Sequence, residues 1–200
     1  MFENILTLSP HTDDAELGCG GVIDKFKKKG SHIHFIAFSW CDNDQLIKEM
    51  KESAKILGID KLEILNFPRR NFFLKRQEIL DILYKLSITE DISLVLTPST
   101  RDLHQDHQVI CNEAIRAFKN STIWGYELPW NNIIFQANCF VKLSKENIEQ
   151  KIKALKCYKT QKNRNYFQED FQWSIVRTRG TQIRAEFAEA FELIKLVVKD

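Results

Sequence analysis

Short apolar runs alternate with longer amphipathic stretches over the first two-thirds of the chain. The runs are rich in Ile, Leu, Val and Phe, which is typical of buried β-strands, and they lie at residues 4–8, 32–39, 62–66 and 92–96. The stretches that follow them carry apolar residues at helical spacing, at 21–29, 44–57, 75–87 and 106–118. This alternation predicts an α/β fold in which a mostly parallel sheet carries helices on both faces.

The last third of the chain has a less regular pattern. Two more strands are expected at 122–127 and 139–143, followed by a helix over 145–159. A further helix is expected to start within 171–178, and a final helix is predicted over 184–197. Because no internal repeat or linker interrupts the pattern, residues 1–200 are expected to form a single domain.

The composition narrows the class of protein without indicating a function. Hydrophobic residues make up 44% and charged residues 28% of the chain, which is ordinary for a soluble globular protein. A formal net charge of +2 provides no argument for nucleic-acid binding. No apolar run of about 18 residues is present, so no transmembrane helix is expected. No signal peptide is recognisable and the five cysteines are widely spaced, so the expected location is a reducing cytoplasm.

Histidines and carboxylates follow two of the expected strands. They are His11, Asp13, Asp14, His104, Asp106 and His107. The first three follow the first strand and the last three follow the strand at 92–96, and the carboxyl ends of parallel strands usually carry the chemistry of such folds. A hydrolytic zinc ion takes three ligands from His, Asp or Glu and leaves one position for water. His11 and Asp14 are close enough in sequence to share an ion, and either histidine of the second cluster completes the set.

The glycines after the first strand suggest a nucleotide-binding loop as an alternative. A GxGxxG pattern requires a third glycine where the chain has Ile23, and no Walker sequence is present. The two adjacent aspartates before the glycines would repel a diphosphate unless a metal ion intervened. Gly18, Gly20 and Gly21 are therefore interpreted as structural, allowing a tight turn and close packing onto the next element.

A zinc ion in this position supports the hydrolysis of an amide. It lowers the pKa of a bound water toward neutrality and polarises the substrate carbonyl. A separate carboxylate must take the proton, and Asp13 is adjacent to a ligand yet free for that role. The leaving amine needs a proton and the oxyanion needs a donor, which a second histidine held by Asp106 can provide.

These residues resemble the signature of the PIG-L/LmbE-like zinc-dependent N-deacetylases. The likeness lies in Pro10-His11-Thr12-Asp13-Asp14-Ala15, His104-Gln105-Asp106-His107 and the late Ala185-Glu186-Phe187-Ala188-Glu189-Ala190-Phe191. Thr12 and Gln105 stand where the family commonly has proline, so we expect a change in loop stiffness more than in mechanism. The resemblance implies a Rossmann-like three-layer sandwich and the removal of an N-acetyl group, usually from an amino sugar.

The resemblance also implies a role for each motif residue. The zinc ligands would be His11, Asp14 and His107. Asp13 would act as the general base, while His104 would stabilise the oxyanion and assist the leaving amine, with Asp106 tuning it. Fe²⁺ is possible in place of Zn²⁺, because two histidines and a carboxylate suit both metals.

The substrate is expected to be a small N-acetylated sugar or its conjugate, which needs polar and aromatic groups near the metal. Candidate contacts are Arg69, Arg70, Arg101 and Glu127. Arginines can pair with a phosphate if the substrate carries one. Trp130 can serve the substrate site, the core or a contact in a homo-oligomer. Two other interpretations stay open: a catalytically silent zinc- or sugar-binding module of the same fold, and a metal-dependent phosphoesterase.

Overall fold

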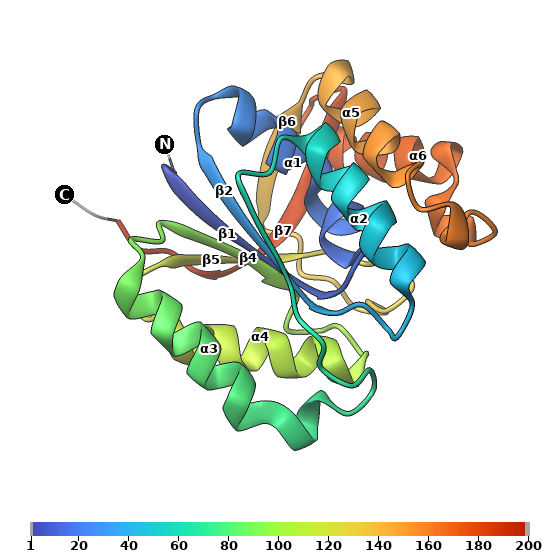
Figure 1. Cartoon of the computed structure of the whole chain (residues 1–200). Helices are drawn as coiled ribbons and strands as arrows, with labels where there is room; N and C mark the ends of the chain where they lie inside the picture. Colours follow the sequence, from blue (N-terminus) through green and yellow to red (C-terminus); the bar gives the residue numbers. More distant parts are fainter. Residues whose placement is uncertain (1, 199–200) are drawn as a thin grey trace.

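The computed structural model describes residues 2–198, whose strands form one seven-stranded sheet (Figure 1). In chain order the strands are β1 (Asn4–His11), β2 (His32–Ser39), β3 (Lys61–Ile64), β4 (Leu94–Pro98), β5 (Thr122–Tyr126), β6 (Cys139–Leu143) and β7 (Phe187–Lys195). In space the order is β3-β2-β1-β4-β5-β7-β6. The five strands from β3 to β5 run parallel, whereas β7 is antiparallel to both of its neighbours. Because β2 and β3 lie on one side of β1 and β4 on the other, the strand order reverses between β1 and β4.

Helices cover both faces of this sheet (Figure 1). They are α1 (Asp14–Lys28), α2 (Asp44–Leu57), α3 (Arg76–Thr89), α4 (Gln105–Ala117), α5 (Lys145–Leu155) and α6 (Glu169–Thr181), with short 3-10 helices η1 (Phe72–Lys75), η2 (Lys159–Gln161) and η3 (Asn165–Phe167). One face carries α3 and α4, and the other carries α1, α2 and α5, while α6 packs against β7. None of the described helices combines the length and apolar character needed to cross a membrane. The predicted α/β class with a mostly parallel sheet is confirmed.

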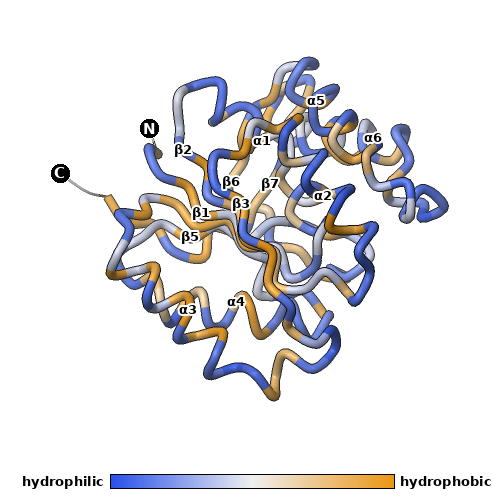
Figure 2. The backbone as a smooth tube through the Cα atoms, in the orientation of Figure 1, coloured by the Kyte–Doolittle hydropathy of each residue, from blue (hydrophilic) through white to orange (hydrophobic). Residues whose placement is uncertain are grey.

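The central strands are buried on both faces, which explains their almost continuous apolar sequences. Ile5 of β1 belongs to the core on the side of α1, α2 and α5. Its neighbours Leu6 and Leu8 belong to the core on the side of α3 and α4. Helix α3 buries one side only, through Ile79 and Leu83, so hydrophobic and hydrophilic residues alternate along it (Figure 2). The carboxyl ends of β1 and β4 connect to the segments that carry the motifs.

The first strand and the first helix both extend further than predicted. The strand continues to His11 and α1 begins at Asp14, so the three glycines lie inside a helix and make no tight turn. Close packing explains at least one of them. A Cβ atom on Gly18 would lie 2.3 Å from Tyr126 Cδ2, well inside van der Waals contact, so α1 can approach β5 only with glycine at this position.

The predicted final helix over 184–197 is wrong. Most of this segment forms β7, which lies between β5 and β6 and pairs with both. The last helix is α6, which ends before it, at Thr181. Phe187 and Phe191 have a spacing that also suits a helix, but both are buried within a strand that completes two ladders. The tertiary partners therefore override the local preference.

A buried ion pair stabilises a break in α1. Cys19 has φ −147° and ψ 21°, which are not helical. Before the break, Lys151 Nζ donates to the carbonyl oxygen of Leu17 at 2.7 Å. After it, two backbone amides donate to the Glu189 carboxylate at 3.1 and 2.7 Å. Lys151 and Glu189 also pair with each other at 2.8 Å, and their side chains are 2% and 3% exposed. The pair thus satisfies backbone groups that the break deprives of helical partners.

Candidate active site

The two sequence motifs meet at the carboxyl ends of β1 and β4, where the strand order reverses. His11 is the last residue of β1 and Asp14 is the first residue of α1. His104 is the N-cap of α4, and His107 lies in its first turn. A parallel sheet opens a crevice at such a point, because the connections from the two strands leave toward opposite faces. Imidazoles that are 96 positions apart in the sequence are thereby brought into contact.

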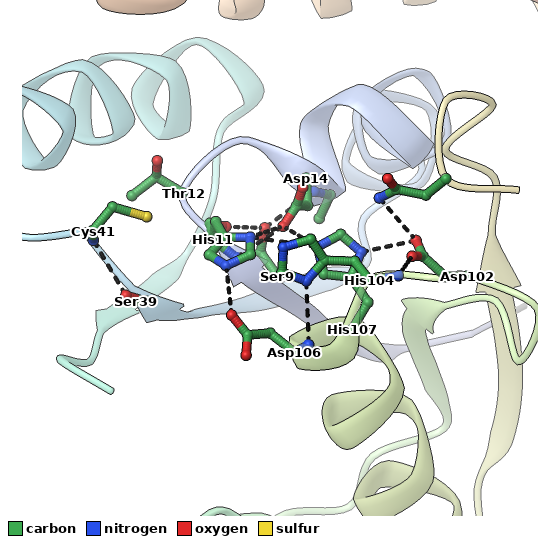
Figure 3. Close-up of polar contacts among 12 residues, drawn as sticks. Ser9, His11, Thr12, Asp14, Ser39, Cys41, Asp102, His104, Asp106 and His107 are labelled. Atoms are coloured by element: carbon green, nitrogen blue, oxygen red, sulfur yellow. Dashed lines mark hydrogen bonds and ion pairs between the residues drawn. The ribbon is translucent and has the colours of Figure 1, made fainter. Parts of the chain in front are cut away.

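Three donor atoms face one another in this crevice (Figure 3). Asp14 Oδ2 lies 3.0 Å from His11 Nδ1 and 3.2 Å from His107 Nε2, and the two nitrogens are 3.4 Å apart. Bonds of about 2.0–2.1 Å to a tetrahedral metal ion place two ligand atoms about 3.3 Å from each other. The three atoms therefore have the spacing that metal ligands require.

In His11 and His107, the outer ring nitrogen, which is the one that points away from Asp14, contacts a carboxylate (Figure 3). His11 Nε2 lies 3.1 Å from Asp106 Oδ2, and His107 Nδ1 lies 2.8 Å from Asp102 Oδ2. Each outer nitrogen is assigned as a donor to its carboxylate, so each inner nitrogen presents a lone pair. Together with the Asp14 carboxylate these lone pairs converge on one point, and only a cation can stabilise that arrangement. The residues present therefore fit a metal ion.

The electrostatics around this point also favour a positive charge. Burial opposes a charged His107, but Asp14 and Asp102 outweigh it and raise the pKa of this imidazole to about 10. Burial likewise opposes the ionisation of Asp14, while the charges of His107 and His11 outweigh it and hold its pKa well below the usual range. Surroundings that stabilise an imidazolium between carboxylates also stabilise a divalent cation in the same place.

His104 lies beside these donors and is held differently. Its Nδ1 accepts a hydrogen bond of 3.2 Å from the backbone N–H of Asp106, so the ring is assigned with its hydrogen on Nε2. Burial and the charges of His107 and His11 lower its pKa, which favours a neutral ring that donates a hydrogen bond. One ring nitrogen from each of the three histidines also lies within 4.8 Å of the other two. His104 is therefore an alternative third ligand.

The Asp106 carboxylate contacts groups other than His104. It accepts from His11 Nε2 at 3.1 Å and from the backbone amides of Arg70 and Phe72 at 2.6 and 3.3 Å. Residues two positions apart in the first turn of a helix point in different directions, which separates this carboxylate from the His104 ring. Asp106 forms its hydrogen bond with His104 through its backbone N–H. Burial lowers the pKa of His104, and the charge of the Asp106 carboxylate opposes this decrease.

Asp13 lines the same cavity without binding to the two imidazoles. No other described side chain forms a hydrogen bond with its carboxylate, and it does not cap α1 through its side chain. Burial and the charge of Asp14 raise its pKa to about 6, and the charges of His11 and Arg164 oppose this increase. A carboxylate with a pKa near neutrality, placed next to the ligands, suits a general base.

The cavity above these residues has a volume of about 280 Å³ and contains part of the expected substrate contacts. Arg69 and Arg70 line it, whereas Arg101 and Glu127 do not. The Glu127 carboxylate accepts two hydrogen bonds from the guanidinium of Arg179, which belongs to α6. Glu127 therefore connects the end of β5 to α6 and does not line this cavity.

Two residues that line the cavity, Arg164 and Tyr166, were not expected from the sequence, and they come from the region of η3. Trp130, one of the interpretations of which was a place in the substrate site, lines the cavity from the segment between β5 and β6. The rings of Trp130 and Tyr166 stack with centroids 3.8 Å apart and planes 13° from parallel. Arg164 and Tyr166 lie in a polar stretch without periodicity, so no pattern marks them. Asp102 was also missed, and its only signal is its position just before the second motif.

Comparison with known proteins identifies the family. The model of the PIG-L family, described as GlcNAc-PI de-N-acetylase, matches residues 6–119, more than half of the chain. The chain therefore belongs to this family. The uncharacterized deacetylase YaiS of Escherichia coli (strain K12) is 29% identical over 169 residues, which is 79% of this chain and 91% of the relative. The matched family segment includes both motifs and the two cavity arginines after β3 but ends before Arg164.

Solved structures share the whole fold. The conserved protein TT1542 from Thermus thermophilus has a TM-score of 0.84 at 23% identity, covering 100% of this chain and 98% of its own. The N,N'-diacetylchitobiose deacetylase from Pyrococcus horikoshii, complexed with its inhibitor MPG, has a TM-score of 0.76 at 22% identity, covering 96% and 83%. The Rossmann-like fold is thus confirmed, and the family with its named relative supports an enzyme that acts as a deacetylase.

Proposed function

We propose that this protein is a zinc-dependent amidohydrolase that removes the N-acetyl group from an amino sugar or an amino-sugar conjugate. The observation that carries the proposal is the convergence of Asp14 Oδ2 with the inner nitrogens of His11 and His107, beside the carboxylate of Asp13. The family description, GlcNAc-PI de-N-acetylase, and the similar fold of the diacetylchitobiose deacetylase support an N-acetylated sugar as the substrate class.

The proposed metal ligands are His11, Asp14 and His107. Asp14 Oδ2 contacts both imidazoles, whereas His104 uses Nδ1 to cap α4, so the carboxylate is preferred over the third histidine. Two histidines and a carboxylate suit Zn²⁺ and also Fe²⁺. When bound, the metal ion lowers the pKa of a water molecule and polarises the amide carbonyl.

The other polar groups of the site move or hold protons. Asp13 takes a proton from the attacking water and returns it to the departing amine. His104 donates its Nε2–H as a hydrogen bond to the oxyanion that develops on the carbonyl, and then to the nitrogen as the amine leaves. The backbone N–H of Asp106 maintains this tautomer of His104. The carboxylates behind the two ligand histidines keep their rings in orientation.

The direct test is the release of a free amine. Protein stripped with a chelator would be reloaded with Zn²⁺, or with Fe²⁺ without oxygen, and incubated with a panel of N-acetylated sugars. We expect no amine from the stripped protein and restored turnover after reloading. Two outcomes contradict the proposal: binding of a sugar without amine release, which indicates a silent binding module, and release of phosphate without amine, which indicates a phosphoesterase.

Loss of the carboxylate behind His107 is expected to weaken metal binding. The substitution Asp102→Asn keeps the shape of the side chain but removes the charge that holds His107 Nδ1. We expect Zn²⁺ affinity to fall by about 10- to 100-fold, measured by competition with a chromogenic chelator. Asp81→Asn is the control, because Asp81 is exposed on α3 and contacts only Gln77 among the described hydrogen-bond partners. Unchanged affinity in Asp102→Asn would refute this role.

A further inference from the structure

The peptide between Thr12 and Asp13 connects a proposed metal ligand to the proposed base. Asp13 is the N-cap of α1, and its side chain makes no capping hydrogen bond. The ligands on either side are held directly, because the backbone N–H and the Nδ1 of His11 both contact Asp14 Oδ2, at 2.9 and 3.0 Å. The direction of the Asp13 side chain therefore depends on what holds its backbone.

A buried hydroxyl contacts this peptide. Tyr158 Oη donates a hydrogen bond to the carbonyl oxygen of Thr12 at 2.6 Å. Tyr158 and Thr12 are each 1% exposed, so the bond is shielded from solvent. Because a peptide unit is planar, an interaction that holds the carbonyl oxygen of Thr12 also holds the nitrogen and the Cα atom of Asp13. The hydroxyl thereby influences the direction in which the Asp13 carboxylate enters the cavity.

The hydroxyl is itself held from a second side. Its oxygen lies 2.6 Å from Glu16 Oε1, and Ser53 Oγ donates to the same carboxylate oxygen at 3.0 Å. Glu16 is 1% exposed, and Ser53 is fully buried on α2. Neither these two residues nor Tyr158 line the cavity. This cluster can therefore affect the reaction only through the residues that do line it.

The turn that carries Tyr158 is anchored to α2. Tyr158 is the N-cap of η2, and Thr160 of η2 donates to the Glu49 carboxylate through its N–H at 3.2 Å and its Oγ1 at 2.6 Å. Glu49 is buried. The ring of Tyr158 also packs edge-on against Phe167, with centroids 5.9 Å apart. A side chain locked by packing and hydrogen bonds can hold a neighbouring group in a precise position.

We propose that Tyr158 is a positioning residue for the deacetylation, and that its hydroxyl holds the Thr12–Asp13 peptide so that the Asp13 carboxylate faces the attacking water. This inference rests on the proposed function, in which Asp13 takes the proton of that water. Proton transfer depends on geometry, and a displacement of about 1 Å can lower a rate by about 100-fold. Tyr158 lies outside residues 6–119, the segment that the family model matches.

The first test removes the hydroxyl and keeps the ring. Tyr158→Phe should lower kcat by about 10- to 100-fold and leave KM and Zn²⁺ affinity within about twofold, because the hydroxyl holds none of the proposed ligands. Tyr126→Phe is the matched control, since Tyr126 is also buried and its hydroxyl also donates to a backbone carbonyl, that of Leu8, at 3.0 Å. Both variants should show a lower urea midpoint, but only Tyr158→Phe should lose turnover.

A double variant shows whether Tyr158 acts through the base. When Asp13 is already replaced by asparagine, Tyr158→Phe should lower the residual rate by less than about twofold, because no base is left to position. The rates would be compared over long incubations. The inference is refuted if Tyr158→Phe lowers the rate by the same factor with and without the Asp13 carboxylate, or if its kcat equals that of Tyr126→Phe.

Crystal structures of the two single variants test the inference without turnover. We expect the Asp13 carboxylate to be displaced in Tyr158→Phe, with the imidazoles of His11 and His107 in place, and to be unmoved in Tyr126→Phe. This displacement supports the positioning role even if the unmodified protein releases no amine, a result that would refute the proposed function alone. An unmoved Asp13 carboxylate in Tyr158→Phe refutes the positioning role even if the unmodified protein is an active deacetylase.

Discussion

Replacing Asp13 by asparagine is expected to lower kcat for N-deacetylation by about 10²- to 10⁴-fold, with the metal retained. The amide has the shape of the carboxylate but cannot take a proton from water. Asp13 lines the cavity and binds neither imidazole, so its replacement should leave the ligand atoms in place. The measurement combines amine release with metal content by atomic emission.

A nearby aspartate provides the control for this substitution. Asp42 is exposed in the loop after β2, does not line the cavity and has φ +51°, a conformation that asparagine tolerates well. Asp42→Asn should change kcat by less than about twofold, as expected for a surface site. Turnover near the unmodified rate in a fully metal-loaded Asp13→Asn protein would show that another group is the base. Loss of the metal would show that Asp13 is a ligand.

Replacing Lys151 by methionine is expected to lower the free energy of unfolding by about 3–5 kcal/mol. The substitution leaves the buried charge of Glu189 without its partner and the carbonyl oxygen of Leu17 without a donor. Equilibrium urea denaturation, followed by tryptophan fluorescence, measures this change. Lys156→Met is the control, because Lys156 pairs with Glu169 at an exposed position, where an ion pair contributes at most about 1 kcal/mol.

The double variant distinguishes a helix cap from an ordinary buried ion pair. Replacing both members of a buried pair by apolar residues often restores stability. Here Lys151→Met with Glu189→Met would leave the backbone groups on both sides of the α1 break without partners, and each unsatisfied group costs about 1–3 kcal/mol. We therefore expect the double variant to remain destabilised. Full recovery would show that the pair does not stabilise the break.

The positions of the two motifs of the candidate site could be predicted because they depend on local pattern. Strand-like runs before His11 and His104 place both imidazoles near the carboxyl ends of strands, and parallel strands bring these ends to one edge. The hydrogen-bond partners could not be predicted in the same way. Asp106 holds His11 and Asp102 holds His107, and these pairings depend on how α4 is oriented over β1.

The remainder of the cavity depends on contacts between distant segments. Arg164 and Tyr166 lie in a polar stretch whose sequence has no helical or strand period, and they reach the site through the stacking of Tyr166 on Trp130. Conversely, Glu127 has the chemistry of a substrate contact but is paired with Arg179. Neither arrangement has a sequence signature, because each is formed by side chains on elements that meet only after folding.

The sequence by itself determined the alternation of strands and helices, the close packing of the glycine-rich stretch after β1, and the residue types of the candidate metal site. These follow from hydrophobic period, glycine content and ligand chemistry, which are local properties. The tertiary structure alone decided that residues 187–195 form a strand, because β5 and β6 offer ladders on both sides. It also decided which nitrogen of each imidazole faces Asp14, because carboxylates from α4 and the loop before it hold the opposite nitrogens.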